Sequence, residues 1–298
     1  MRTVRSRQRL QLPSRLAIAG VALLTALWTP AIARAARTTD SPATVNAEIS
    51  QVPQQFGEAQ FCAEDLPRAI DAVVGRPQFN TANWGIVVYP LNDGRTLYSR
   101  NANTMLIPAS NTKLFTTAAT IRILLERAPD ALWEMTDDLN LVNRNSNNAR
   151  ADDLLRRIGG QYQVQAALEP LGVSPDGYVQ ADGSGLSRAN RAQPATLVSL
   201  LKGMHEADSS GLFYSSLPVG GVNGTLRNRF QGTAAQGKLH AKTGTLRGVR
   251  ALSGYLETDD YGTVIFSVLV NQSGQSGRVM LDAIDELVLL MAKLEACG

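Results

Sequence analysis

Two residues of this 298-residue chain have the types and spacing of an activated nucleophile, Ser110 and Lys113. They lie within Ile107-Pro-Ala-Ser-Asn-Thr-Lys-Leu-Phe-Thr-Thr-Ala-Ala-Thr, which predicts the start of a buried helix. Side chains three positions apart share one face of a helix, with Cβ atoms roughly 5–6 Å apart. The amine would then stand beside the hydroxyl, as an activated serine requires. A helix-capping serine beside a surface lysine is the structural alternative.

This nucleophile hypothesis makes demands on both residues. At a helix N-terminus, the backbone N–H of Ser110 and the helix dipole would favour the negative charge that develops in acyl transfer. Lys113 can act as a base only if burial or a nearby positive charge lowers its pKa. Lys242, far along the chain, could supply that charge.

A second polar cluster is Ser146-Asn147-Asn148, which can project a hydroxyl and an amide into a cleft. Ser146 would relay a proton between Lys113 and a leaving amine, and Asn148 would bind a substrate backbone. The alternative is structural, because the same residue types form turns and helix N-caps.

A third cluster is Lys242-Thr243-Gly244-Thr245, at the end of a predicted strand. Lys242 and Thr243 would bind a substrate carboxylate, and Gly244 would let the strand backbone approach a ligand closely. The N–H of Thr245 would be a second donor of the oxyanion hole. The alternative is a strand that simply ends in a glycine turn.

The elements that must position these clusters follow from periodicity and turn signals. Helices are predicted over residues 63–74, 110–127, 151–158, 162–171, 196–207 and 278–295. Strands are predicted over residues 84–89, 95–99, 239–243, 250–257 and 263–271. Strands at both ends with helices between them imply an α/β (α+β) fold, in which one antiparallel sheet is built from both chain ends. A helical subdomain at about 114–235 would pack against it.

The N-terminus predicts export from the cytoplasm. Five arginines precede an apolar run from Leu16 to Trp28, and Ala33-Arg34-Ala35 fits a cleavage site. Residues 1–35 therefore predict a signal peptide, with an uncleaved anchor as the alternative. Residues 36–58 are predicted to form a flexible leader, and residues 59–298 are predicted to form the folded domain. No later apolar stretch is long enough to span a bilayer, so we expect a periplasmic or extracellular product without a stable membrane anchor.

The charge of the chain argues against nucleic acid as a partner. The whole chain carries +3, and residues 1–35 contain six arginines and no acidic residue, so the remainder carries −3. The basic character therefore belongs to the targeting segment.

Two cysteines, Cys62 and Cys297, lie near the two ends of the folded region, on the predicted terminal helices. An oxidising compartment permits a disulfide that would contribute on the order of 4–5 kcal/mol by loop closure. Two separate buried thiols are the alternative. Neither cysteine is spaced with His205 or His240 as a metal ligand would be, so we expect no metal, and no organic cofactor is indicated.

The three clusters together, in the order S-x-x-K, S-x-N and K-T-G, are the signature of penicillin-recognising serine enzymes. The chain resembles the D-alanyl-D-alanine carboxypeptidase/endopeptidase family S13, the class C low-molecular-weight penicillin-binding proteins. The segments that carry this resemblance are Pro108-Ala-Ser-Asn-Thr-Lys-Leu, Asp182-Gly-Ser-Gly-Leu-Ser187, Leu217-Pro-Val-Gly-Gly, Gly224-Thr-Leu-Arg-Asn-Arg-Phe230 and Ala241-Lys-Thr-Gly-Thr-Leu246.

The resemblance implies a serine-type D-Ala-D-Ala carboxypeptidase or DD-endopeptidase that acts on peptidoglycan stem peptides and is inhibited by β-lactams. It implies catalytic roles for Ser110, Lys113 and Ser146. It implies substrate-binding roles for Asn148, Lys242, Thr243, Gly244 and Thr245. The glycines around Ser184 indicate a tight loop near the cleft, without a chemical role for the serine itself.

The chain departs from the resemblance in one place. Only residues 114–145 separate Lys113 from Ser146, where members of the family usually carry large extra domains. We expect residues 140–148 to bridge this deletion and the cleft to be more open. Two other functions stay in view, namely a β-lactamase or esterase on the same scaffold and a catalytically weak cell-wall-binding protein. The oligomeric state stays open.

Overall fold

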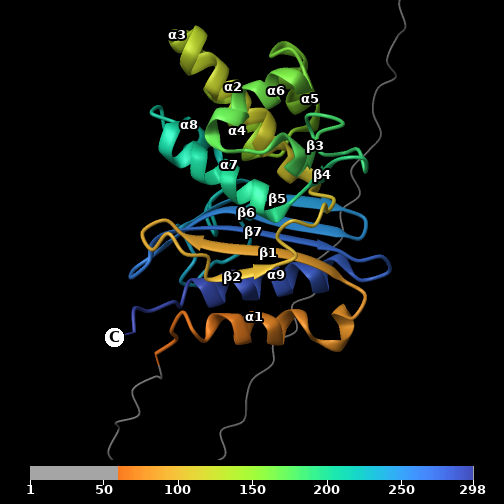
Figure 1. Cartoon of the computed structure of the whole chain (residues 1–298), viewed down its shortest axis with the longest axis vertical. Coiled ribbons are helices and arrows are strands. Elements are labelled where there is room, and N and C mark those ends of the chain that lie inside the picture. Colours follow the sequence, from red (N-terminus) through yellow and green to blue (C-terminus); the bar gives the residue numbers. More distant parts are fainter. Residues whose placement is uncertain (1–59, 298) are drawn as a thin grey trace, which may run out of the picture. The chain divides into compact units, whose positions relative to one another are not determined.

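A five-stranded antiparallel sheet separates two layers of helices (Figure 1). The computed structural model describes residues 60–297, so the predicted signal peptide and leader lie outside the described residues. The strand order is β2-β1-β7-β6-β5, which places strands from the two ends of the domain side by side. This arrangement confirms the predicted antiparallel sheet built from both chain ends.

The strands of this sheet are β1 (Asn83–Pro90), β2 (Tyr98–Arg100), β5 (Leu239–Leu246), β6 (Val249–Thr258) and β7 (Gly262–Asn271). A separate ribbon pairs β3 (Tyr178–Val179) with β4 (Arg191–Ala192). The middles of β6 and β7 are buried on both faces. The sequences of both strands are therefore nearly continuous apolar runs, which is typical of strands covered by helices on both faces. Strand β2 begins later than predicted, because turns and bends occupy the residues between Leu91 and Leu97.

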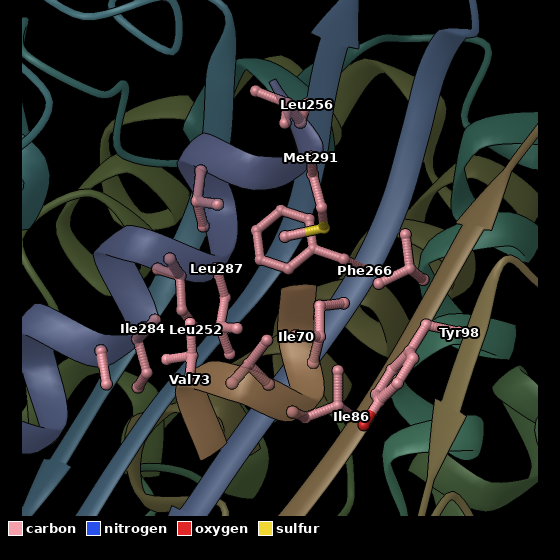
Figure 2. Packing of buried hydrophobic residues seen from close by; sticks show 14 of the residues in the cluster. Ile70, Val73, Ile86, Tyr98, Leu252, Leu256, Phe266, Ile284, Leu287 and Met291 are labelled. Atoms are coloured by element: carbon pink, nitrogen blue, oxygen red, sulfur yellow. The ribbon is translucent and has the colours of Figure 1, made fainter. Parts of the chain in front are cut away.

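The terminal-helix layer consists of α1 (Leu66–Val74) and α9 (Gly277–Met291). Helix α1 buries Leu66, Ile70 and Val73, which recur at helical spacing on one face. Figure 2 shows Ile70 and Val73 beside apolar side chains of α9 and the sheet. Both helices are shorter than predicted, and α1 begins at Leu66 because Pro67 favours the first turn of a helix.

A disulfide joins Cys62 to Cys297, with Cα atoms 5.7 Å apart, so the predicted pairing is confirmed. The prediction that both cysteines lie on the terminal helices is wrong. Cys62 precedes α1 and forms a β-bridge with Glu295, and Cys297 follows the end of α9. The Glu295 N–H donates to the carbonyl of Phe61 at 3.0 Å, so backbone pairing aligns the two segments that the disulfide joins.

The central-helix layer covers the other face of the sheet (Figure 1). Its helices are α2 (Thr112–Arg127), α3 (Pro129–Glu134), α4 (Thr136–Asn143), α5 (Asn148–Arg157), α6 (Gln161–Leu168), α7 (Pro194–Ala207) and α8 (Leu212–Ser216). Single 3₁₀ turns lie at η1 (Pro77–Phe79), η2 (Ala109–Asn111), η3 (Glu169–Leu171), η4 (Pro175–Gly177) and η5 (Gly224–Leu226). Helix α2 is buried from Thr112 to Ile121, because neighbouring helices surround it.

Three helices of this layer escaped the sequence-based prediction: α3, α4 and α8. Residues 140–148, the expected bridge, run from the last turn of α4, which buries Leu139 and Val142, to the start of α5. Asn148 begins α5, three residues earlier than the predicted helix start. Within the described residues, none of the helices has the length and apolar character needed to cross a membrane.

Candidate active site

Ser110 and Lys113 stand beside each other where η2 passes into α2. The Nζ atom of Lys113 lies 3.0 Å from the Oγ atom of Ser110. Ser110 is partly exposed, whereas Lys113 is 0% exposed. The α-helix begins at Thr112 rather than at Ser110, so the serine occupies a tighter 3₁₀ turn than predicted.

Two acceptors fix the orientation of the Lys113 amine. Its Nζ donates to Asn148 Oδ1 at 2.7 Å and to the backbone carbonyl of Ser184. A neutral amine has two N–H donors and one lone pair. Because both neighbours only accept, they hold the two N–H groups and leave the lone pair facing Ser110 Oγ. This is the geometry of a base poised to take the hydroxyl proton.

Burial lowers the pKa of Lys113 to about 8, because desolvation disfavours the charged form. The carboxylates of Asp152 and Asp182 oppose this change. Burial also lowers the pKa of Lys242 well below its ordinary value, and the charge of Lys113 lowers it further. Of the two causes that the sequence left open for Lys113, burial dominates.

The loop from Asp182 to Ser187 delivers the Ser184 carbonyl. Its shape is set by Asp182, whose carboxylate accepts the N–H groups of Gly185 and Ser187, both at 2.6 Å. Gly185 has φ +85°, and a Cβ there would collide with the carbonyl of Ala109, so only glycine fits against η2. Ser184 had no predicted chemical role, because residue type carries no information about the use of a backbone carbonyl.

Ser146 contacts Lys242 rather than Lys113. Lys242 Nζ donates to Ser146 Oγ at 3.0 Å and to the carbonyl of Thr243 at 3.2 Å. Asn147 caps α5 by accepting the Arg150 N–H at 2.9 Å. The structural alternative therefore applies to the middle residue of this cluster, while its two neighbours reach the buried lysines.

Asn111, within the S-x-x-K cluster itself, was missed by the sequence-based prediction. Its Nδ2 donates to the carbonyl of Lys242 at 2.8 Å, and its Oδ1 accepts from Ser253 Oγ at 2.7 Å. This side chain ties η2 to the sheet. Strand β5 can approach because Gly244 has no side chain, and a Cβ there would lie 2.7 Å from the carbonyl oxygen of Pro108.

The rest of the third cluster lies toward solvent. Thr243 Oγ1 donates to Thr225 Oγ1 at 2.8 Å, so Thr225 joins the site although the sequence assigned it no role. Thr245 lies farther along β5, is exposed, and makes no side-chain hydrogen bond within residues 60–297. In the same residues, no group of three His, Cys, Asp or Glu side chains is arranged to hold a metal ion.

Comparison with known proteins identifies relatives that are similar to part of this chain. A penicillin-sensitive carboxypeptidase A from Dictyostelium discoideum is 34% identical over 179 residues, which are 54% of this chain and 34% of that protein. A D-alanyl-D-alanine carboxypeptidase from Actinomadura is 39% identical over 176 residues, 54% of this chain and 32% of that protein. The chain thus covers about a third of the length of these relatives.

Solved structures share the fold at low identity. Penicillin binding protein 4 (dacB) from Haemophilus influenzae superposes with a TM-score of 0.66 and 14% identity, covering 76% of this chain and 99% of that chain. The TLA-3 extended-spectrum β-lactamase superposes with a TM-score of 0.63 and 17% identity, covering 77% and 98%. The match to a family model is broader, because the D-Ala-D-Ala carboxypeptidase 3 (S13) family matches residues 66–128 and 131–294. With its Ser110–Lys113 pair set in this fold, the chain belongs to the D-Ala-D-Ala carboxypeptidase 3 (S13) family.

Proposed function

We propose that this protein is a serine-type D-Ala-D-Ala carboxypeptidase or DD-endopeptidase that acts on peptidoglycan stem peptides outside the cytoplasm. The observation that carries the proposal is the buried Lys113 amine, 3.0 Å from Ser110 Oγ, with a pKa lowered to about 8. At pH 7 such an amine is neutral in roughly a tenth of molecules, far more than an ordinary lysine, and a general base requires this neutral form.

In the proposed acylation step, Lys113 Nζ takes the hydroxyl proton while Ser110 Oγ bonds to the carbonyl carbon between the two D-alanines. The C–N bond then breaks, and the leaving amine takes the proton that Lys113 accepted, relayed through the hydroxyl of Ser146, which the Lys242 amine contacts. Lys113 is neutral again after this transfer. The acyl group remains on Ser110, and water releases it in the second step.

Substrate binding would use the remaining residues of the clusters. The Asn148 oxygen is engaged by Lys113, so its amide nitrogen is the group that would donate to a substrate carbonyl. Thr243 and Lys242 would hold the terminal carboxylate, and the backbone N–H groups of Ser110 and Thr245 would form the oxyanion hole. β-Lactams would acylate Ser110 in place of the peptide.

Fluorescent penicillin tests this proposal directly. We expect the purified protein to form a covalent adduct that survives denaturation and is lost in Ser110→Ala. The matched control is Ser187→Ala, in the loop next to the site, which should retain labelling. Adduct formation in Ser110→Ala would overturn the assignment of the nucleophile.

A nitrocefin assay separates this function from that of a β-lactamase on the same scaffold. The proposal predicts one rapid acylation and slow turnover, because a peptidase is trapped by the β-lactam. Fast multiple turnover would favour the β-lactamase. The absence of both labelling and muropeptide cleavage would favour a cell-wall-binding protein.

A further inference from the structure

A polar hollow continues the site past Thr243. Its volume is about 330 Å³. It is lined by Asn145, Gly224, Thr225, Arg227, Asn228 and Arg229. Asn145 directly precedes Ser146, and Thr225 Oγ1 lies 2.8 Å from Thr243 Oγ1. One wall therefore adjoins the serine proposed to protonate the leaving amine, and another adjoins the threonine proposed to hold the terminal carboxylate.

The walls of this hollow are fixed against each other. The Thr225 N–H donates to the carbonyl of Arg144 at 3.1 Å, which ties η5 to the end of α4. Two contacts fix the Arg229 side chain: its Nε donates to Asp285 Oδ1 at 3.0 Å, and its guanidinium lies over the Phe230 ring. The hollow thus combines elements that are far apart in the sequence into one preformed surface.

The hollow presents donors and positive charge, and none of its lining residues is acidic. The side chains of Asn145, Arg227 and Asn228 are exposed. Within residues 60–297, the Arg227 guanidinium makes no ion pair and no hydrogen bond, whereas that of Arg229 is neutralised by Asp285. A guanidinium and two amides together suit a ligand that carries a carboxylate and peptide carbonyls.

We propose that this hollow is a leaving-group subsite, which receives the second stem peptide of a cross-linked substrate and pairs Arg227 with one of its carboxylates. This inference rests on the proposed function. When the leaving group is free D-alanine, only a methyl group extends beyond the reacting amine and the carboxylate, and most of the hollow stays unused. When the leaving amine belongs to a cross-linked stem, a peptide chain follows it and can occupy the hollow.

The experiment compares two substrates on the same protein. We expect Arg227→Gln to lower kcat/KM for cleavage of a cross-linked muropeptide dimer by about fivefold, the upper range for an exposed ion pair. Release of D-alanine from a monomeric pentapeptide should change less than about twofold, because that leaving group does not reach Arg227. Arg227→Lys should recover part of the lost dimer cleavage.

The matched control is Arg68→Gln, which removes another exposed arginine, on α1 and outside the lining of the hollow. It should affect neither substrate. Equal losses on both substrates in Arg227→Gln, or no loss on either, would overturn the subsite. So would a wild-type protein that cleaves the monomer and not the dimer.

Fluorescent penicillin labelling, which needs no leaving-group subsite, separates this proposal from the proposed function. Labelling without selective loss of dimer cleavage rejects only the subsite. No labelling of the wild type rejects the enzyme itself. Thermal unfolding of each variant shows whether the substituted protein is folded, and binding of the dimer to Ser110→Ala, with and without Arg227→Gln, gives a second measurement that does not depend on turnover.

Discussion

The two faces of the sheet are packed with different kinds of side chain. Toward the terminal-helix layer, the sheet and helices α1 and α9 share a continuous apolar cluster (Figure 2). The central-helix side also has an apolar cluster, but it buries two lysines that are 0% exposed, Lys113 and Lys242. Burying charge opposes folding, whereas burying apolar surface favours it. Both faces therefore contribute apolar burial, and the central-helix face also contains the residues proposed to carry the chemistry.

The polar side chains on the central-helix side form a connected set around η2 and β5. Asn111 bonds to the Lys242 carbonyl and to Ser253, and the Ser253 and Ser267 hydroxyl oxygens lie 2.9 Å apart. Each bond satisfies a group that would otherwise be costly to bury. Such a network holds the site in one arrangement, which catalysis needs more than it needs added stability.

Replacing the base should give the largest effect and should separate chemistry from stability. We expect Lys113→Met to slow covalent labelling by penicillin by about 10⁴-fold, because no general base remains beside Ser110. The free energy of unfolding should change by less than about 2 kcal/mol, because a buried amine is replaced by an apolar chain of similar length. Labelling kinetics and thermal unfolding measure the two effects, and labelling at the wild-type rate would contradict the assignment of the base.

Removing the disulfide should act on the other face alone. Cys62 and Cys297 are 235 residues apart in sequence, so the disulfide closes a long loop. We expect Cys62→Ser to lower the free energy of unfolding by about 4 kcal/mol, with little change in the rate of labelling. Urea unfolding checks this. Cys62→Ser with Cys297→Ser should be no less stable than the single variant, and a further loss in the double variant would show that the thiols contribute separately.

Truncating one apolar side chain should produce a smaller loss in the same layer. Leu287 on α9 is 0% exposed within the cluster shown in Figure 2. We expect Leu287→Ala to lower the free energy of unfolding by about 3 kcal/mol, from lost burial and the cavity left behind. The labelling rate of the folded protein should stay within about twofold. A large fall in that rate would show that the two faces are coupled.

The smallest effect concerns the pH dependence of acylation. Because the folded-state pKa of Lys113 is lowered to about 8, the neutral base forms as the pH rises through 8, and the labelling rate should rise with it. Asp152 raises the pKa of Lys113, and its Oδ1 is buried without a hydrogen-bond partner among the described residues. Asp152→Asn should therefore move this rise to lower pH.

Asp153→Asn is the matched control for this shift, since Asp153 is the next residue of α5 and pairs with Arg156 at the surface. Its pH profile should coincide with that of the wild type. If both variants shift the profile equally, the effect is one of overall charge, and the specific coupling between Asp152 and Lys113 is rejected.

Sequence-based reasoning worked best where periodicity is long and local. The apolar runs of β6 and β7 and the amphipathic faces of α1 and α9 follow from residue order, and the structure confirms these elements with shifts at their ends. The sequence-based prediction missed the short helices. Helix α8 has five residues, too few for a clear period, and it is stabilised by packing against other elements.

Within the site, the sequence by itself determined the Ser110–Lys113 contact, because residues three apart on a helical segment meet whatever surrounds them. The tertiary structure decided which residues distant in the sequence contact the two buried lysines. The Ser184 carbonyl reaches Lys113 across 71 residues, and Ser146 reaches Lys242 across 96. The tertiary structure also sets the lowered pKa of Lys113, because burial depends on the helices and loops that exclude water around this side chain. Residue types fix which groups can react, and only packing fixes how far each group is from water and from its partners.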